Sequence, residues 1–176
     1  MSLNRHDTLL HELNGTAEGF LRSLEGIPAD RWSYSPSPSV WSVEQTAEHT
    51  VAVFRNIQRL LAKKLLERPL PPGEKSPVSD DAIIRAMFDR SKRFEAPEFV
   101  IPKGRWATLG EMIAAFTDAR EQLLQWLDET TVDLRGYTAD HAMIGQMDGV
   151  QWLLFVAAHT ERHTRQILEF RQAQGF

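Results

Sequence analysis

The chain of 176 residues contains no cysteine, and this absence narrows the chemistry that it can perform. Without cysteine there are no disulfides and no thiolate metal sites, so a bound metal must be held by histidine, aspartate or glutamate. No side chain can act as a thiol nucleophile either. A reaction that uses sulfur as its nucleophile must therefore take the thiol from outside the chain.

Long apolar runs are also missing. The first residues, MSLNRHDTLLHELNG, lack the uninterrupted apolar core of a signal peptide, and no run elsewhere reaches transmembrane length. Basic charge is not in excess, because the net charge is −4 and the pI is near 5.9, which argues against nucleic-acid binding. We therefore expect a cytoplasmic protein that binds neither membranes nor nucleic acids.

What is present is the composition and periodicity of a helical protein. Hydrophobic residues make up 42% and charged residues 25%, as in ordinary globular domains. Apolar residues recur at three-to-four-residue spacing, and capping pairs such as Ser42 with Gln45 and Asp148 with Gln151 mark helix starts. Helices are expected over residues 3–25, 42–68, 80–94, 109–129 and 149–173.

The segments between these helices show no convincing strand pattern. Residues 28–41 are rich in proline and serine, residues 96–108 read as extended chain, and residues 130–147 read as a loop. Four long helices without a sheet indicate an all-α fold, a helical bundle. The length suits one domain with its own core, and we assign residues 1–176 to it.

Two histidines in the last helix raise the question of a metal site. His159 and His163 are four residues apart, so both side chains lie on one face of the helix and can reach one ion. The spacing alone is equally compatible with two core or surface histidines. Large apolar residues on the same face, including Trp152 and Phe170, place the pair toward the bundle interior.

His49 is the candidate for a third ligand. It lies near the start of the helix over residues 42–68, on the face that we expect to point inward. Two histidines from one helix and one from its neighbour form an accessible arrangement inside a bundle. Three histidine ligands leave a coordination position for water or substrate, as catalytic metal sites do. Ordinary buried or exposed histidines remain the alternative at this point.

A resemblance to a known family covers nearly the whole chain. The stretches RWSYSPSPSVWSVEQTAEHTV and DHAMIGQMDGVQWLLFVAAHTERHTRQI are similar in order and spacing to motifs of the DinB/YfiT-like superfamily of metal-binding four-helix proteins. His49, His159 and His163 fall on the three ligand positions of that family. His141 falls on a further histidine often seen before a glycine, here Gly145, although alanine follows it where many relatives have proline.

The resemblance implies a four-helix bundle with long crossover connections, commonly a homodimer, that holds a divalent metal such as zinc, nickel or manganese. Characterised relatives include thiol S-transferases and a thiol-dependent isomerase, which use a low-molecular-weight thiol such as bacillithiol or mycothiol. Others are assigned only as metal-dependent hydrolases. The family name refers to DNA damage, but nothing in this sequence supports DNA chemistry.

Three functions follow from these observations. We favour transfer of a low-molecular-weight thiol to a small electrophilic substrate, because no general base for hydrolysis is evident. Glu48 and Glu161 lie beside the ligands in sequence, but neighbours on a helix diverge by about 100° and should point elsewhere. Hydrolysis by metal-activated water is the alternative. A non-catalytic, stress-associated metal-binding dimer is the third.

Three further residues are candidates to contact the substrate or support a ligand. They are His141 in the loop, Gln166 one turn past His163, and Asn56 on the inner face that also carries His49. Ordinary packing or surface roles are the alternative for each of them. Trp41 and Trp152 are expected in the core or in the wall of a pocket.

Overall fold

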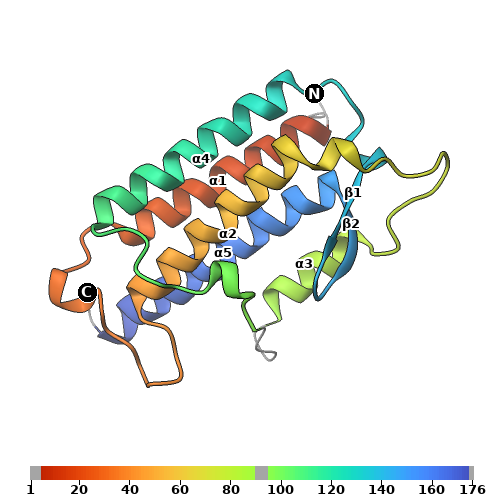
Figure 1. Cartoon of the computed structure of the whole chain (residues 1–176). Helices are drawn as coiled ribbons and strands as arrows, with labels where there is room; N and C mark the ends of the chain where they lie inside the picture. Colours follow the sequence, from red (N-terminus) through yellow and green to blue (C-terminus); the bar gives the residue numbers. More distant parts are fainter. Residues whose placement is uncertain (1–4, 90–94, 175–176) are drawn as a thin grey trace.

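The structure is a computed structural model that describes residues 5–89 and 95–174. Four long helices lie side by side in a bundle (Figure 1): α1 (Arg5–Leu24), α2 (Val43–Lys63), α4 (Leu109–Glu129) and α5 (Gly149–Gln174). A short helix, α3 (Asp80–Phe88), packs against α5. The predicted all-α four-helix bundle is therefore confirmed.

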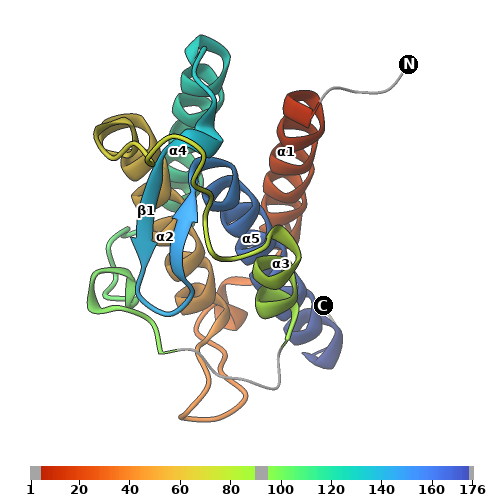
Figure 2. The same ribbon diagram turned by 90° about the vertical axis from the view of Figure 1, so that its right-hand side faces the viewer.

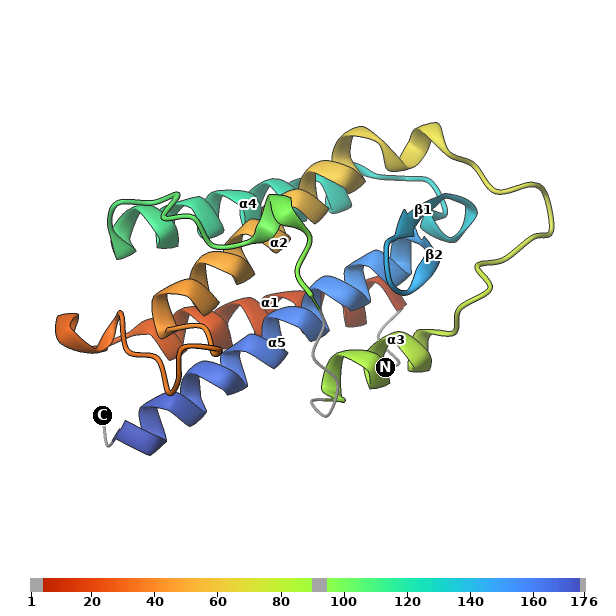
Figure 3. The same cartoon turned by 60° about the horizontal axis from the view of Figure 1, so that its bottom comes forward.

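The long crossover connection is also present. Helices α2 and α4 run in the same direction (Figures 1 and 3), so the chain between them must return along the bundle. The described residues 64–89 and 95–108 belong to this return and include α3. Helix α5 contacts both α1 and α2, while α4 contacts α2. This order places α5, the helix with the histidine pair, directly against α2, the helix with His49.

Local sequence signals fix where the two site-bearing helices begin. At the start of α2 the Gln45 N–H donates to Ser42 Oγ at 3.1 Å, and the Ser42 N–H donates to Gln45 Oε1 at 2.9 Å. At the start of α5 the same reciprocal bonds join Asp148 and Gln151, at 2.9 and 3.0 Å. Both predicted capping boxes are confirmed. They fix where each of the two helices begins.

Two predicted helix ends differ from the structure. The helix expected to reach residue 68 ends at Lys63 and continues as a 3-10 turn, Leu65–Glu67. The helix expected over 80–94 ends at Phe88, because the next residue has an extended backbone with ψ of 98°. Residues 90–94 lie outside the described part of the chain.

A β-hairpin lies where the sequence predicted a loop. Strand β1 (Thr138–His141) pairs antiparallel with β2 (Gly145–Asp148), with His141 opposite Gly145. Gly145 has a φ of +94°, in the left-handed region that favours glycine. The loop prediction for residues 130–147 was wrong for the two strands, because strands of four residues carry too little alternation to be recognised.

Tertiary contacts hold this hairpin against α5 (Figure 2). The indole N–H of Trp152 donates to the Ala139 carbonyl oxygen at 3.2 Å, and the Met147 side chain is fully buried. Ser76, from the chain before α3, donates to the Gln146 carbonyl oxygen at 2.8 Å. The hairpin is therefore a fixed part of the fold, and it places His141 beside the first two turns of α5, against Trp152 and Phe155.

The bundle core is aromatic and aliphatic. Phe116 is fully buried between Phe20 and Phe54, with ring centroids 4.8 and 4.9 Å away. The apolar first half of α5 is buried, as its sequence predicted. Within the part of the chain that the structure describes, no helix is both long and apolar enough to span a bilayer.

Candidate metal centre

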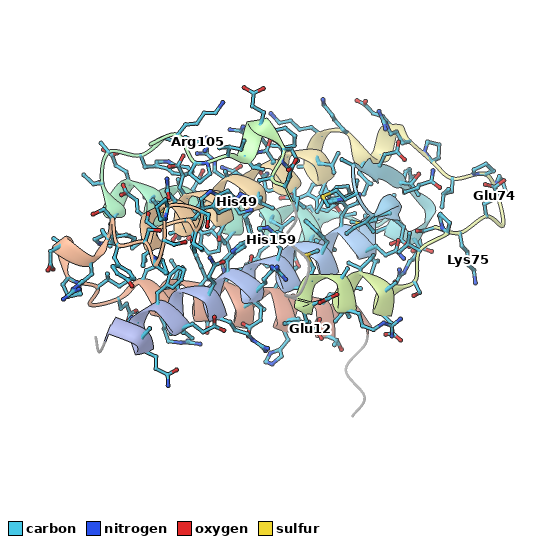
Figure 4. The ribbon with its side chains drawn as sticks, turned by 90° about the horizontal axis from the view of Figure 1, so that it is seen from below. Glu12, His49, Glu74, Lys75, Arg105 and His159 are labelled. Carbon is cyan, nitrogen blue, oxygen red and sulfur yellow. The ribbon has the colours of Figure 1, made fainter. Side chains whose placement is uncertain are left out.

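The structure brings the three predicted histidines together. His49 on α2 and His159 and His163 on α5 each offer a ring nitrogen, and these atoms all lie within 4.8 Å of one another. All three side chains are buried, with exposed fractions of 5%, 8% and 8%. Figure 4 shows His49 and His159 in the interior between the two helices.

The geometry follows from the helix positions. His159 and His163 are one turn apart on α5, and their ring centroids are 4.5 Å apart. The His49 ring lies 5.0 Å from each of them. Because α2 packs against α5, a single histidine on α2 is enough to close the triangle.

The hydrogen bonds of His49 fix which nitrogen is available to a metal. Its Nδ1 lies 2.9 Å from the carbonyl oxygen of Val100, which can only accept, so Nδ1 carries the proton. The lone pair is therefore on Nε2, which lies 3.1 Å from His159 Nε2. Two nitrogens this close need a proton or a cation between them. Nitrogens bound at about 2.1 Å to one ion have a similar separation.

The other two histidines differ in their support. His163 Nδ1 lies 3.1 Å from Gln166 Oε1, which leaves Nε2 for a ligand role, so the predicted contact of Gln166 is present. His159 Nδ1 is buried and has no hydrogen-bond partner among the described residues. Asn56 does not join the cluster. It is half-buried, and its Nδ2 donates to the Ala52 carbonyl oxygen at 2.8 Å.

Burial lowers the pKa of two of the three histidines, His49 and His159. Desolvation lowers the pKa of His49 to about 4, and the positive charge of Arg105 also lowers it, although the bond to Val100 opposes this. Burial also lowers the pKa of His159 well below its usual value, and the neighbouring histidines and Arg162 lower it further. At neutral pH these imidazoles therefore present lone pairs, the form in which histidine binds metals. The residues fit a divalent ion.

The pKa of His49 gives a prediction for the metal-free protein. An unfolded histidine has a pKa of about 6.5, so between pH 6.5 and 4 the unfolded chain binds more protons than the folded one. The stabilisation is complete above pH 6.5 and is lost as the pH falls toward 4. We expect His49 to contribute a loss of about 3 kcal/mol in unfolding free energy between pH 7 and 4.

Urea unfolding of chelator-treated protein across this pH range measures the loss. The His49→Gln variant is the control, since it lacks the titrating ring. Its unfolding free energy should fall less steeply with acidification than that of the wild type. If the unfolding free energy fell equally steeply with acidification in both proteins, the lowered pKa of His49 would be contradicted.

His141 lies near the cluster without joining it. Its ring packs 4.7 Å from Phe155 and 5.5 Å from Trp152, and Phe155 in turn lies 5.6 Å from His159. The N–H groups of Met143 and Ile144 donate to its Nδ1 at 3.2 and 3.3 Å. Burial lowers the pKa of His141, so at neutral pH the ring is neutral and its proton is on Nε2.

Glu48, beside a ligand in sequence, has an unexpected role. It points away from the cluster as predicted, but it is buried and accepts hydrogen bonds from the loop that precedes α4. No sequence motif identifies this contact, because most of its partners are backbone N–H groups. The second carboxylate beside the ligands, Glu161, forms an ion pair with Arg165 at 2.6 Å.

Aromatic side chains surround the cluster. The Trp41 ring lies 4.7 Å from the His49 ring, and Phe155 lies against His159. Trp41 is half-buried and Trp152 is buried, in agreement with the prediction that they line the core or a pocket. Two cavities elsewhere, of about 270 and 170 Å³, are not lined by any of the three histidines.

Comparison with known proteins decides the family. The family model of the DinB superfamily matches residues 12–167. The chain belongs to the DinB superfamily. This DinB protein is also similar to an uncharacterized protein, YuaE, from Bacillus subtilis (strain 168). The two are 21% identical over 149 residues, which cover 85% of this chain and 88% of YuaE.

Two solved structures share the fold of this DinB protein. TT2238, a four-helix bundle protein, superposes with a TM-score of 0.59 at 18% identity, over 93% of this chain and 98% of TT2238. YfiT from Bacillus subtilis, described as a probable metal-dependent hydrolase with an unusual four-helix bundle topology, superposes with a TM-score of 0.59. YfiT is 13% identical, and the match covers 100% of this chain and 91% of YfiT. At these identities the likeness establishes the fold.

Proposed function

We propose that this protein is a metal-dependent enzyme that transfers a low-molecular-weight thiol to a small electrophilic molecule. His49, His159 and His163 would hold one divalent ion, with zinc, nickel or manganese as the candidates. The observation that carries the proposal is the set of three buried imidazoles from two helices, whose ring nitrogens lie within 4.8 Å of one another. Three ligands leave open coordination positions, which distinguishes such a set from a closed structural site.

A divalent ion at this site supplies a Lewis acid that lowers the pKa of a thiol or of water. The chain supplies no sulfur, because it contains no cysteine, so the thiol comes from solution. In the transfer, sulfur forms a bond to an electrophilic carbon, the leaving group takes the bonding electron pair, and the thiol proton goes to solvent. Trp41 and Phe155 pack on the imidazoles and exclude water from them.

The carboxylates support transfer over hydrolysis. A hydrolase benefits from a general base close to the attacking water. Glu48 is engaged by the loop before α4 and Glu161 by Arg165, so each has a partner away from the cluster. His141 is no substitute, because its Nδ1 accepts from the turn and its Nε2 carries a proton. We propose that His141 donates from Nε2 to an oxygen or anionic group of the substrate.

Hydrolysis is the second candidate, and the description of YfiT as a probable metal-dependent hydrolase favours it. A panel of low-molecular-weight thiols and electrophiles, assayed with and without metal, separates the two. Conjugate formation that needs the thiol, the metal and the protein supports transfer. Turnover of esters or amides by the metal-loaded protein without any thiol would show that the activity is hydrolysis and not thiol transfer. No turnover in either arm would leave a non-catalytic metal-binding protein.

The role of His141 gives a separate prediction. In His141→Asn the amide oxygen takes the place of Nδ1 and accepts from the N–H groups of the turn, but the N–H donor at Nε2 is lost. We expect kcat/KM for conjugation to fall about 10- to 100-fold, the usual effect of losing a hydrogen bond to a charged group. The metal dissociation constant should stay within about twofold, because the ring is not a ligand. Unchanged kcat/KM would contradict the assignment.

The homodimer and the cytoplasmic location stay predictions from the sequence. Neither is needed for the site, because all three histidines come from one chain.

A further inference from the structure

The loop that precedes α4 lies over His49 and makes contact with it. This loop contains a 3-10 turn, Glu98–Val100, and its Val100 carbonyl oxygen accepts from His49 Nδ1. We propose that Glu48 and Arg105 are positioning residues that hold this carbonyl in place and thereby orient His49 for metal binding. The inference rests on the proposed metal site, and it names residues that do not touch the ion.

Glu48 is the anchor on the helix side. Its side chain is only 3% exposed, and one oxygen accepts from the Lys103 N–H at 2.8 Å while the other accepts from the Gly104 N–H at 2.9 Å. The Arg105 N–H adds a longer bond of 3.3 Å. Three successive backbone donors on one carboxylate fix the loop to α2 at the residue next to His49. Gly104 makes this possible with a φ of +69°.

Arg105 carries the constraint from Glu48 to the turn. Its Nη1 donates to Glu48 Oε1 at 2.6 Å, and its Nη2 donates to the Phe99 carbonyl oxygen at 3.0 Å. Phe99 directly precedes Val100, so one guanidinium group ties the buried carboxylate to the peptide next to the one that bonds His49.

The charge on Glu48 is favoured by this environment. Burial would raise the pKa of its carboxyl, but the bonds from the three backbone N–H groups and from Arg105 outweigh burial and lower it. Both oxygens must accept, which an ionised carboxylate does and an amide does not. A glutamine at this position would direct an NH₂ group at a backbone N–H or at the guanidinium group. The contact therefore requires the acid and not only its shape.

The consequence for His49 is a fixed tautomer. A neutral imidazole can carry its proton on either nitrogen, and the hydrogen bond made by one nitrogen decides which it is. With the Val100 carbonyl held in place, the proton stays on Nδ1 and the Nε2 lone pair faces His159. If the carbonyl moved away, the ring could exchange tautomers and rotate. Such support of a ligand is typically worth 10- to 100-fold in metal affinity.

The test compares Glu48→Gln and Arg105→Met with Glu161→Gln. The control removes the other carboxylate beside the ligands, whose partner Arg165 is on its own helix. The first readout is the dissociation constant of Zn²⁺, measured by competition with a chelating dye. The second is the tautomer of His49 in the metal-free protein at neutral pH, from long-range ¹H–¹⁵N NMR correlations.

We expect a 10- to 100-fold weaker Zn²⁺ affinity in Glu48→Gln and in Arg105→Met, and a change within twofold in the control Glu161→Gln. The metal-free wild type should show the proton on Nδ1 of His49. Glu48→Gln and Arg105→Met should each show a mixture of the two His49 tautomers. Folded variants with unchanged affinity and an unchanged tautomer would overturn the inference. If Glu48→Gln fails to fold, Arg105→Lys, which keeps the charge but not the second contact, decides by the same readouts. Failure of the wild type to bind zinc, nickel or manganese would refute the proposed function, while the NMR readout still tests whether Glu48 and Arg105 fix the tautomer of His49.

Discussion

Replacing His159 with alanine is expected to abolish metal binding while the protein keeps its helical content. His159 is the centre of the cluster, since its Nε2 lies 3.1 Å from His49 Nε2 and its ring lies 4.5 Å from that of His163. Loss of one ligand in three should weaken the affinity at least about 10³-fold. Alanine suits a helix interior, and the substitution also removes a buried nitrogen that has no partner among the described residues.

Isothermal titration with Zn²⁺ and far-ultraviolet circular dichroism measure the two halves of this prediction. His11→Ala is the control, because His11 is exposed on α1, and it should bind metal like the wild type. Retained affinity in His159→Ala would remove His159 from the ligand set. Global unfolding of the variant would make the metal structural and argue against an open catalytic site.

The second large effect is expected from Arg135→Ala. The Arg135 guanidinium donates to both oxygens of Asp80, at 2.8 and 2.6 Å, and to both oxygens of Asp148, at 3.2 and 2.9 Å. Asp148 is buried, ends β2 and caps α5, so its charge would lose its cationic partner. Burial already raises the pKa of Asp148 against the influence of Arg135. Breaking a buried pair in this way should cost about 3 kcal/mol of unfolding free energy.

Urea unfolding at pH 7 tests this value. Arg85→Ala is the matched control, because Arg85 pairs with Asp81 one turn away on α3 and both side chains are exposed. Such a surface pair should contribute less than about 0.5 kcal/mol. A loss below about 1 kcal/mol in Arg135→Ala would show that its ion pairs with Asp80 and Asp148 contribute little to stability.

Much of the fold could be predicted because its signals are local. The apolar stripes and the capping boxes at Ser42 and Asp148 depend on residues within one or two turns, and both boxes are present. The histidine cluster was harder to predict from the sequence, since the spacing of His159 and His163 shows only that the two side chains share one face of a helix. The inward face of α2 and the family motifs supplied His49.

What the sequence could not show depends on contacts between distant segments. The hairpin is held by Trp152, whose indole reaches the backbone of Ala139, and four-residue strands alone carry no clear pattern. The carbonyl of Val100 beside His49 has no sequence signal, because every residue has a carbonyl group. Glu48 was expected to point away from the ligands, and it does, but its contacts with the loop could not be read from spacing.

Elemental analysis of protein purified without a histidine tag tests the central claim most directly. The protein would be reconstituted separately with zinc, nickel and manganese and freed of excess ion by gel filtration. Three converging imidazoles predict about one ion per chain for at least one of these metals. Less than about half an equivalent with all three would contradict the account of this site.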